Sequence, residues 1–171
     1  MPLHPPHLMP EPLEGSSSVM NIRPIQASDQ DEWLQMRIAL YGDKESVLAA
    51  EIQRFFSGQA GEPLTVLVAE QDDRLVGMAE LSVHLYAEGC QSDHVGYLEG
   101  WYVIPSSRNQ GIGRELLKAS EAWARSQDCT ELATDTHLEN VEVAKIYKNC
   151  GYQEVAQLRC FRKTIAVDPN L

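Results

Sequence analysis

A turn with two closely spaced glycines constrains the fold of this chain more than any other part of the sequence. Residues 96–104 (GYLEGWYVI) predict a strand that ends before Pro105, because proline cannot donate a hydrogen bond to a sheet. Gly111 and Gly113 follow, and residues 108–125 carry apolar side chains at helical spacing. Where a strand leads through such a turn into a helix, free amide groups and the positive end of the helix dipole face outward together. The pattern therefore predicts an anion-binding site in an α/β protein.

Two other phosphate-binding motifs do not account for this turn. A P-loop needs a lysine and then a serine or threonine after its last glycine, and a dinucleotide-binding turn needs a third glycine where Leu116 stands. Glycine still lets the backbone approach a phosphate closely, since it has no Cβ atom. From these residues alone two interpretations remain: a phosphate site, or a glycine turn that only caps an ordinary helix.

The rest of the chain predicts strands and helices without an internal repeat. Residues 27–29 supply capping groups for a first helix, and residues 46–56 repeat apolar side chains at helical spacing. Residues 64–70 and 75–85 are β-branched and apolar on either side of a turn, which indicates an antiparallel hairpin. In order, we expect a strand at 20–25, two helices, strands at 64–70, 75–85 and 96–104, a helix at 108–125, a strand at 131–136, a helix at 140–150 and a final strand at 152–165. The predicted order is βααβββαβαβ.

The length of 171 residues and the hydrophobic fraction of 43% are sufficient for one domain with its own core. Residues 1–19 are rich in Pro, Ser and His and show no hydrophobic periodicity. We expect an expression leader or a disordered tail there, with Met20 as the natural start. A single domain is expected at residues 20–167.

The net charge of −11 and the four cysteines argue against several classes of function. An acidic chain disfavours nucleic acids and attracts cationic partners, although solubility alone explains the charge equally well. The cysteines form no Cys-x-x-Cys pair, so we expect no metal site and no disulfide framework, but reduced thiols in a cytoplasmic protein. No run of about 18 apolar residues is present, and we expect no membrane segment.

The glycine turn and the element order together resemble the GNAT N-acetyltransferase superfamily. Arg108-x-x-Gly111-x-Gly113 is similar to the [Gln/Arg]-x-x-Gly-x-[Gly/Ala] loop of that family, and Ala144-x-x-Tyr147-x-x-x-Gly151-Tyr152 resembles its late helix entering the last strand. The resemblance covers residues 20–165. It implies the GNAT acyl-CoA N-acyltransferase fold, of the α/β (α+β) class, with a mixed, mostly antiparallel central sheet flanked by helices.

A finer resemblance is to the aminoglycoside 6′-N-acetyltransferases within that superfamily. It is carried by residues 97–103 (YLEGWYV), 133–140 (ATDTHLEN), 151–154 (GYQE) and 161–163 (FRK). The resemblance implies transfer of an acetyl group from acetyl-CoA to the 6′-amino group of an aminoglycoside, by direct attack in a ternary complex, and thereby antibiotic resistance. A covalent route would need an activated cysteine, and none of the four has a base beside it in the sequence. A homodimer is expected because dimers are common in this family.

The same resemblance implies where acetyl-CoA binds. The expected site is a V-shaped opening between the strand that ends at Val103 and the strand 131–136. Backbone groups of Trp101, Tyr102 and Val103 would hold the pantetheine arm, and a backbone N–H near Val103 would steady the developing oxyanion. The cofactor-binding residues implied in full are Trp101, Tyr102, Val103, Arg108, Gln110, Gly111, Ile112, Gly113, Arg114 and Asn140. Asparagine at the start of a helix is an equally common cap, so both roles stay open for Asn140.

Three residues are candidates for the chemistry. An amine attacks only when it is neutral, so a group must accept its proton, and Glu99 and Asp135 stand on the two strands that face each other. We expect Glu99 to accept the proton and bind substrate, and Asp135 to bind substrate; otherwise both are solvated or ion-paired carboxylates. Tyr147 matches the superfamily's tyrosine that protonates the departing thiolate, and its alternative is packing on one helix face.

Aromatic and acidic residues are expected to contact the sugar rings. Tyr41 and Tyr86 match positions where the 6′ enzymes place aromatic side chains, which suit sugars and ammonium groups. The acidic contact that some relatives carry is absent at Ala156, and Glu154 is the nearby replacement we predict.

Two further functions remain compatible with the sequence. One is an N-acetyltransferase of the same fold that acts on a protein, a polyamine or another small amine. The other is a catalytically silent acyl-CoA sensor, against which the presence of Glu99, Asp135 and Tyr147 argues.

Overall fold

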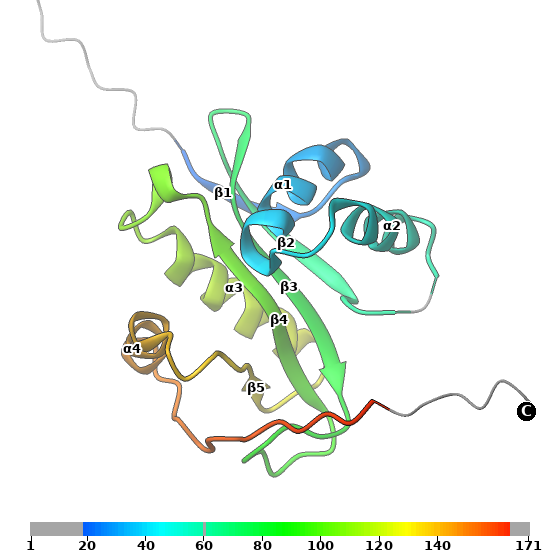
Figure 1. Ribbon diagram of the computed structural model, residues 1–171. Helices are drawn as coiled ribbons and strands as arrows, with labels where there is room; N and C mark the ends of the chain where they lie inside the picture. The colour runs from blue at the N-terminus through cyan, green and yellow to red at the C-terminus, as the bar shows by residue number, and fades with distance from the viewer. Residues whose placement is uncertain (1–18, 60, 165–171) are drawn as a thin grey trace, which may run out of the picture.

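The computed structural model describes residues 19–59 and 61–164, and in them a sheet is covered by helices on both faces (Figure 1). The strands are β1 (Asn21–Pro24), β2 (Thr65–Gln71), β3 (Arg74–His84), β4 (Val95–Val103) and β5 (Leu132–Ala133). The helices are α1 (Gln30–Tyr41), α2 (Glu45–Phe56), α3 (Ile112–Ser126) and α4 (Val141–Asn149), with short 3-10 turns η1 (Ala27–Asp29) and η2 (Pro105–Ser107). The strands follow one another in the sheet in the order β1-β2-β3-β4-β5, and only β4 and β5 run parallel. The predicted mixed, mostly antiparallel sheet is confirmed.

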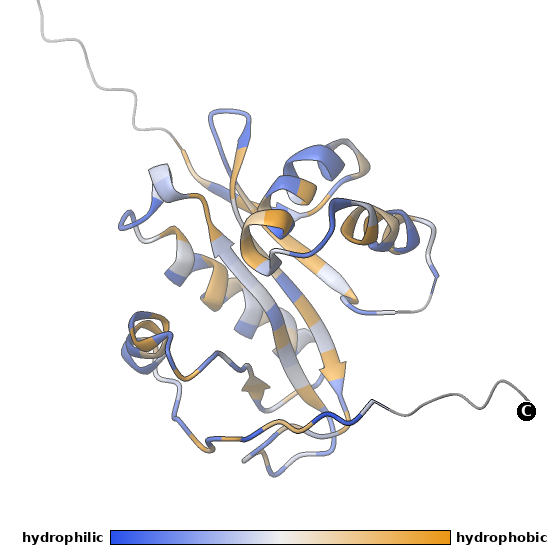
Figure 2. Ribbon diagram, viewed as in Figure 1, coloured by the Kyte–Doolittle hydropathy of each residue, from blue (hydrophilic) through white to orange (hydrophobic). Residues whose placement is uncertain are grey.

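Strand β2 shows how the sequence separates two hydrophobic layers. Its side chains alternate between the faces of the sheet, as the twofold period of a strand requires. Leu67 and Ala69 join the layer beneath α3, whereas Val66 and Val68 join the layer beneath α1 and α2. Hydrophilic residues colour the β2–β3 turn in Figure 2, outside both layers. The central strands, which carry the candidate site, are packed between these two layers.

A β-bulge at Glu99 interrupts the register between β3 and β4. Glu80 pairs with Gly100, and Leu81 pairs with Leu98, so Glu99 is an extra residue on β4. A bulge of this kind turns two consecutive side chains toward the same face. Glu99, which stands in an apolar stretch of the sequence, is thus the residue at which the alternation of side chains between the two faces of β4 is interrupted.

The bulge decides which face Glu99 occupies. Leu98 packs in the layer beneath α3. Glu99 instead contacts His84, and a Cβ atom at Gly100 would collide with the hydroxyl of Tyr41 from α1. Glu99 and Gly100 are therefore both directed toward the α1 side of the sheet.

Beneath the bulge, a buried carboxylate ties the sheet to α1. Glu80 is 1% exposed and accepts hydrogen bonds from Trp33 Nε1 and Tyr41 Oη, both at 2.7 Å. Arg37 Nε lies 3.0 Å from the same carboxylate, and Arg37 Nη1 lies 2.9 Å from Glu51 of α2. A buried charge is tolerated only when it is paired and hydrogen-bonded, and Glu80 meets both conditions. Burial, and then the Glu80 charge, raise the pKa of Tyr41 far above its usual range.

Three predicted elements were wrong in extent or existence. The helix expected from residue 108 begins at Ile112, because Asn109 and Gly111 have positive φ angles that an α-helix does not accept. Strand β5 is limited to Leu132–Ala133 instead of 131–136, since β4 pairs with it only at Gly96 and Tyr97.

The final strand predicted at 152–165 is not formed at residues 152–164. This segment is extended without a ladder partner, and Figure 1 shows it crossing the open end of the molecule near the β3–β4 loop. We call residues 153–164 the C-terminal arm. Its apolar side chains Val155, Leu158 and Phe161 are exposed, with Phe161 at 92%. An alternating pattern predicts a strand only where another strand is available to pair, and none of the described residues supplies one here.

The expected leader at 1–19 lies outside the described residues except for Val19, and so do residues 165–171. Within the described part of the chain, no helix has both the length and the apolar character needed to cross a bilayer.

We predict that Gly100→Ala lowers the free energy of unfolding by about 1–3 kcal/mol, because the new methyl group must displace the Tyr41 hydroxyl from its place against the sheet. Urea unfolding measures the change. Gly61→Ala is the matched control: among the described residues, its chain neighbours apart, no atom lies within 4 Å of its Cβ position, and we expect a change below about 0.5 kcal/mol. Equal losses in the two variants would contradict the packing argument.

Candidate active site

Strands β4 and β5 separate just where the predicted site begins. Their parallel pairing ends at Tyr97 and Ala133, and the Thr134 hydroxyl then donates to the Leu98 carbonyl at 3.0 Å. Beyond this point β4 continues to Val103, and no described strand pairs with it on that side. The edge of β4 at residues 99–103 that faces away from β3 is therefore open to a ligand that offers its own hydrogen-bonding groups.

The glycine turn joins the end of β4 to α3. Gly111 is the N-cap of α3 with φ at 83°, and no side chain caps the helix. Because amides in the first turn of a helix have no intrahelical acceptor, they remain available to an anion. Arg108 anchors the turn to the strand: its Nε donates to the Val103 carbonyl at 2.9 Å, and its guanidinium lies 5.6 Å from the Tyr102 ring centroid. The predicted anion site is thus held at the end of β4.

A second contact fixes the turn from below. Trp101 Nε1 donates to the Gly113 carbonyl at 3.2 Å, and a Cβ atom at Gly113 would overlap the indole ring. Gly113 is therefore needed for close packing and Gly111 for backbone conformation, so the two glycines serve different purposes.

A hollow of about 300 Å³ lies between α3 and α4, next to the turn. It is lined by Arg114, Leu117, Lys118, Glu121, Asn149 and Cys150. Two of these residues are cationic, and Arg114 belongs to the predicted cofactor-binding set.

Glu99 stands in a hydrogen-bonded group on the α1 side of the sheet. His84 Nε2 lies 2.6 Å from Glu99 Oε1 and 3.1 Å from Glu62 Oε1. Burial raises the pKa of Glu99, and the hydrogen bond from His84 opposes this shift. A raised pKa suits a group that must accept a proton near neutral pH.

The three side chains place possible metal-ligand atoms within 4.8 Å of one another. Two ligand atoms on a tetrahedral zinc ion lie about 3.3 Å apart. The 2.6 Å separation of His84 and Glu99 is instead that of a charge-assisted hydrogen bond. We therefore describe the group as a hydrogen-bonded cluster.

Asp135 follows β5 and is exposed. It accepts a hydrogen bond of 2.6 Å from the Tyr97 hydroxyl, so it is tied to β4 just where the two strands part. Burial, and then this hydrogen bond, raise the pKa of Tyr97. The charges of Glu99 and Asp135 both act on Tyr97, which places both predicted acids around one tyrosine.

Tyr147 projects from α4 into an aromatic cluster. Its ring centroid lies 5.5 Å from that of Trp101 and 5.4 Å from that of Tyr152. Burial raises the pKa of Tyr147, and the Asp135 charge adds to the shift. The side chain packs against the core, as one interpretation expected, and its hydroxyl stays protonated at neutral pH, as a proton donor requires.

The remaining predicted residues differ in how firmly they are held. Tyr41 is half-buried and anchored through Glu80, whereas Tyr86 is 66% exposed in the β3–β4 loop. Asn140 stands at the N-cap position of α4 but makes no capping hydrogen bond; its amide donates to Thr136 Oγ1 at 3.1 Å.

Glu154, the predicted substitute for the acid missing at Ala156, pairs with Lys148 at 2.7 Å. A hydrogen bond from Gln157 lowers the pKa of Glu154, and the contact with Lys148 lowers it further. Substrate contact by Glu154 stays a prediction.

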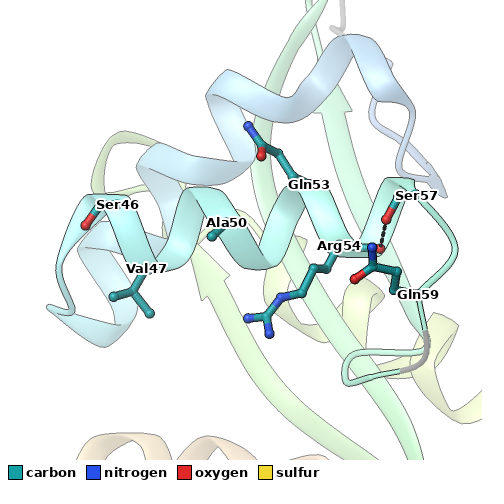
Figure 3. Close-up of a pocket in the computed structure, with 7 residues that line it drawn as sticks. All are labelled: Ser46, Val47, Ala50, Gln53, Arg54, Ser57 and Gln59. Atoms are coloured by element: carbon teal, nitrogen blue, oxygen red, sulfur yellow. Dashed lines mark hydrogen bonds between the residues drawn. The ribbon is translucent and has the colours of Figure 1, made fainter.

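Another hollow, with a volume of about 700 Å³, lies along α2 (Figure 3). It is lined by Ser46, Val47, Ala50, Gln53, Arg54, Ser57 and Gln59. None of the predicted site residues lines it, and it holds no carboxylate. We therefore locate the candidate site at β4 and the turn into α3.

Sequence reasoning missed His84 and Glu80. Both lie, with Ser82 between them, at alternate positions of one largely apolar strand, and no motif marks them. Their importance follows from the bulge, which brings Glu99 and Gly100 over them.

Comparison with known proteins places this geometry among acetyltransferases. Residues 27–152 match the model described as acetyltransferase (GNAT) family. The aminoglycoside N(6′)-acetyltransferase type 1 of Klebsiella aerogenes is 46% identical over 146 residues, covering 84% of this chain and 96% of that protein.

Two solved acetyltransferase structures are also similar to this chain. Aminoglycoside N-acetyltransferase AAC(6′)-Iy in complex with CoA is 30% identical and has a TM-score of 0.81, covering 90% of this chain and 100% of that one. AAC(6′)-Iy in complex with the bisubstrate analogue CoA-S-monomethyl-acetylneamine is 29% identical and has a TM-score of 0.79, covering 86% and 100%.

We predict that Glu99→Gln stabilises the folded chain at neutral pH. Because folding raises the Glu99 pKa, the stability that this carboxyl contributes is present below its unfolded pKa of about 4.3 and is lost as pH rises through the folded value. Glutamine cannot ionise, so the variant should exceed the wild type by about 0.5–2 kcal/mol at pH 8, and the difference should vanish near pH 4.

Urea unfolding at both pH values measures this difference. Glu139→Gln is the matched control, because it removes the same charge at an exposed position. A Glu99→Gln variant that is less stable than the wild type at pH 8 would contradict the desolvation argument.

Proposed function

The chain belongs to the aminoglycoside 6′-N-acetyltransferases of the GNAT acetyltransferase family, and from this premise we propose that it transfers the acetyl group of acetyl-CoA to the 6′-amino group of aminoglycoside antibiotics. One observation carries the proposal. A bulge in β4 directs the Glu99 carboxylate toward the α1 side of the sheet. The same strand ends at the turn that leads into the uncapped start of α3. A proton acceptor and a diphosphate site thus share one strand.

The co-substrate is expected to bind along β4 and the glycine turn. Amides of residues 110–114 would hold the pyrophosphate, with the positive end of the α3 dipole behind them. Backbone groups of Trp101, Tyr102 and Val103 would bind the pantetheine arm where β4 has left β5. Arg108 contributes by holding the turn against Val103.

The reaction needs a proton acceptor and a proton donor. Glu99 takes the proton of the substrate ammonium, directly or through a water molecule, and the neutral nitrogen attacks the thioester carbon. The C–N bond forms as the C–S bond breaks, and a backbone N–H near Val103 steadies the negative charge on the carbonyl oxygen. Tyr147 gives its proton to the departing sulfur, and it regains a proton, through solvent, as the nitrogen loses its second proton to become the neutral amide. No acetyl-enzyme is formed in this scheme.

Aminoglycosides carry several ammonium groups, which suits an acidic site. Glu99 and Asp135 lie around Tyr97, and the chain has a net charge of −11, which favours the approach of a cation. Tyr41 would face a sugar ring from a fixed position, and Tyr86 from the β3–β4 loop. Acetylation of the 6′ nitrogen removes its positive charge, and we propose antibiotic resistance as the result.

We further propose a cytoplasmic location and a single domain at residues 20–167, with residues 1–19 outside it. The cytoplasm supplies acetyl-CoA, and its reducing conditions suit Cys90, Cys129, Cys150 and Cys160, all of which are free.

A homodimer is also proposed, and the C-terminal arm supports it. Val155, Leu158 and Phe161 are exposed on a segment that has no ladder partner. Exposed apolar side chains grouped on one extended segment are typical of a surface that another chain covers.

A panel of amines tests the activity. We expect the wild type to release CoA with kanamycin and tobramycin at rates at least 100-fold above those with spermidine or a peptide N-terminus. NMR of the product should place the acetyl group on the 6′ nitrogen. Preference for spermidine or the peptide would contradict the proposed substrate, and CoA binding without turnover on any amine would indicate a sensor.

Three variants test whether proton transfer, aminoglycoside binding and acetyl-CoA binding depend on different residues. Glu99→Ala should lower kcat about 100-fold or more, and Asp135→Ala should raise the KM for kanamycin about tenfold, while both keep their affinity for acetyl-CoA. Gly111→Val should lose that affinity, because its side chain would meet the pyrophosphate and its φ is positive. Equal loss of acetyl-CoA binding in all three would contradict the scheme.

Sedimentation velocity tests the dimer. We expect the wild type to sediment as two chains at micromolar concentration and Phe161→Asp to sediment as one, because a carboxylate at a covered apolar position opposes association. Glu139→Gln, an exposed change outside the arm, should leave the dimer intact. A monomeric wild type would contradict the proposal.

A further inference from the structure

His84 is the residue in the site to which neither the sequence motifs nor the proposed reaction gives a role. It is the last residue of β3, and its side chain is about one quarter exposed. Its Nε2 atom lies 2.6 Å from Glu99 Oε1, within hydrogen-bonding distance of this carboxylate. Glu62 reaches the same nitrogen from the rim at 3.1 Å. His84 is thus placed to hold the proton acceptor in one orientation.

The ring of His84 also makes a second, independent contact. It stacks on the ring of Tyr97, with centroids 4.3 Å apart and planes inclined by 6°. Tyr97 pairs across the sheet with Ser82, two residues before His84, so the two rings are diagonal neighbours on one face. The Tyr97 hydroxyl then donates to Asp135 Oδ1 at 2.6 Å. A continuous path runs from Glu99 through His84 and Tyr97 to Asp135.

We propose that His84 and Tyr97 form a positioning platform that sets the spacing and orientation of the Glu99 and Asp135 carboxylates, so that two amino groups of one acceptor are engaged together. The proposal rests on the proposed aminoglycoside activity. Both residues act through the carboxylates they hold and are positioning residues, not catalytic ones.

Elementary chemistry explains why such a platform is useful. A carboxylate has about four lone-pair sites, so one donor can orient it and still leave sites for an ammonium group. Glu99 projects from a bulge and Asp135 follows a strand of two residues, so neither is oriented by a regular ladder. Two stacked rings between them fix their separation. An acceptor with correctly spaced amines then gains from both carboxylates, whereas a single amine gains from only one.

Conservative variants separate the two halves of the platform. His84→Phe keeps a ring against Tyr97 and removes the nitrogen that reaches Glu99, whereas His84→Gln keeps an N–H donor and removes the ring. Tyr97→Phe keeps the ring and removes only the hydroxyl that binds Asp135. Each variant is assayed with kanamycin and with 6-amino-6-deoxyglucose, which carries one amine.

We expect a split between kcat and KM. His84→Phe should lower kcat about tenfold for both acceptors with little change in KM, and His84→Gln should restore most of the loss. Tyr97→Phe should raise the KM for kanamycin about tenfold and leave the single-amine acceptor unchanged. Acetyl-CoA affinity should stay within about twofold and Tm within a few degrees in every variant.

The outcomes distinguish this proposal from the proposed function. If the wild type acetylates no aminoglycoside, the proposed function fails. If the wild type is active and His84→Phe and Tyr97→Phe match it, the platform is wrong and the function stands. A His84→Gln variant as poor as His84→Phe overturns the role of the hydrogen bond, and equal losses on both acceptors in Tyr97→Phe overturn the role in spacing.

Discussion

The bulge at Glu99 is the constraint on which the rest of the site depends. In a regular strand Glu99 would face away from Gly100, and one of the two would enter the layer beneath α3. The extra residue turns both toward α1, where a glycine is required at 100 because the Tyr41 hydroxyl occupies the space of a side chain. Glu80 holds that hydroxyl in place from below. The buried Glu80 and the glycine at 100 thus both support the bulge that directs the Glu99 carboxylate toward α1.

Strand β4 also forms the part of the site where we propose that acetyl-CoA binds. Because β5 is short, β4 loses its parallel neighbour after Tyr97, and from there to Val103 the edge that faces away from β3 has no strand partner among the described residues. The turn that follows is held to the strand by Arg108 and to the core by Trp101. These contacts place the uncapped start of α3 at the end of the free edge. The thioester site and the base that we propose therefore lie within a few residues of one another on the same strand.

Much of this could be predicted from the sequence, because local patterns determine it. The β2–β3 hairpin, the β4 strand that ends before Pro105 and the glycine turn all follow from turn chemistry and hydrophobic periodicity, and the GNAT fold implied by the resemblance is confirmed. The length of β5 and the absence of a strand at 152–164 could not be predicted, since pairing depends on which other strands are within reach. His84 and Glu80 could not be found either, because the sequence does not reveal that a bulge would bring Glu99 and Gly100 above them.

The buried group around Glu80 tolerates fewer amino-acid substitutions than the β3–β4 loop and the C-terminal arm. Glu80, Trp33, Arg37 and Tyr41 restrain one another, so exchanging any one of them strands a buried charge or hydroxyl. The β3–β4 loop and the C-terminal arm meet only at the edge of the fold, where Val155 lies against Gly89. Tyr86 and Glu154, two of the substrate contacts that we propose, belong to this loop and this arm, so substitutions there would change the accepted aminoglycosides while the buried framework stays intact.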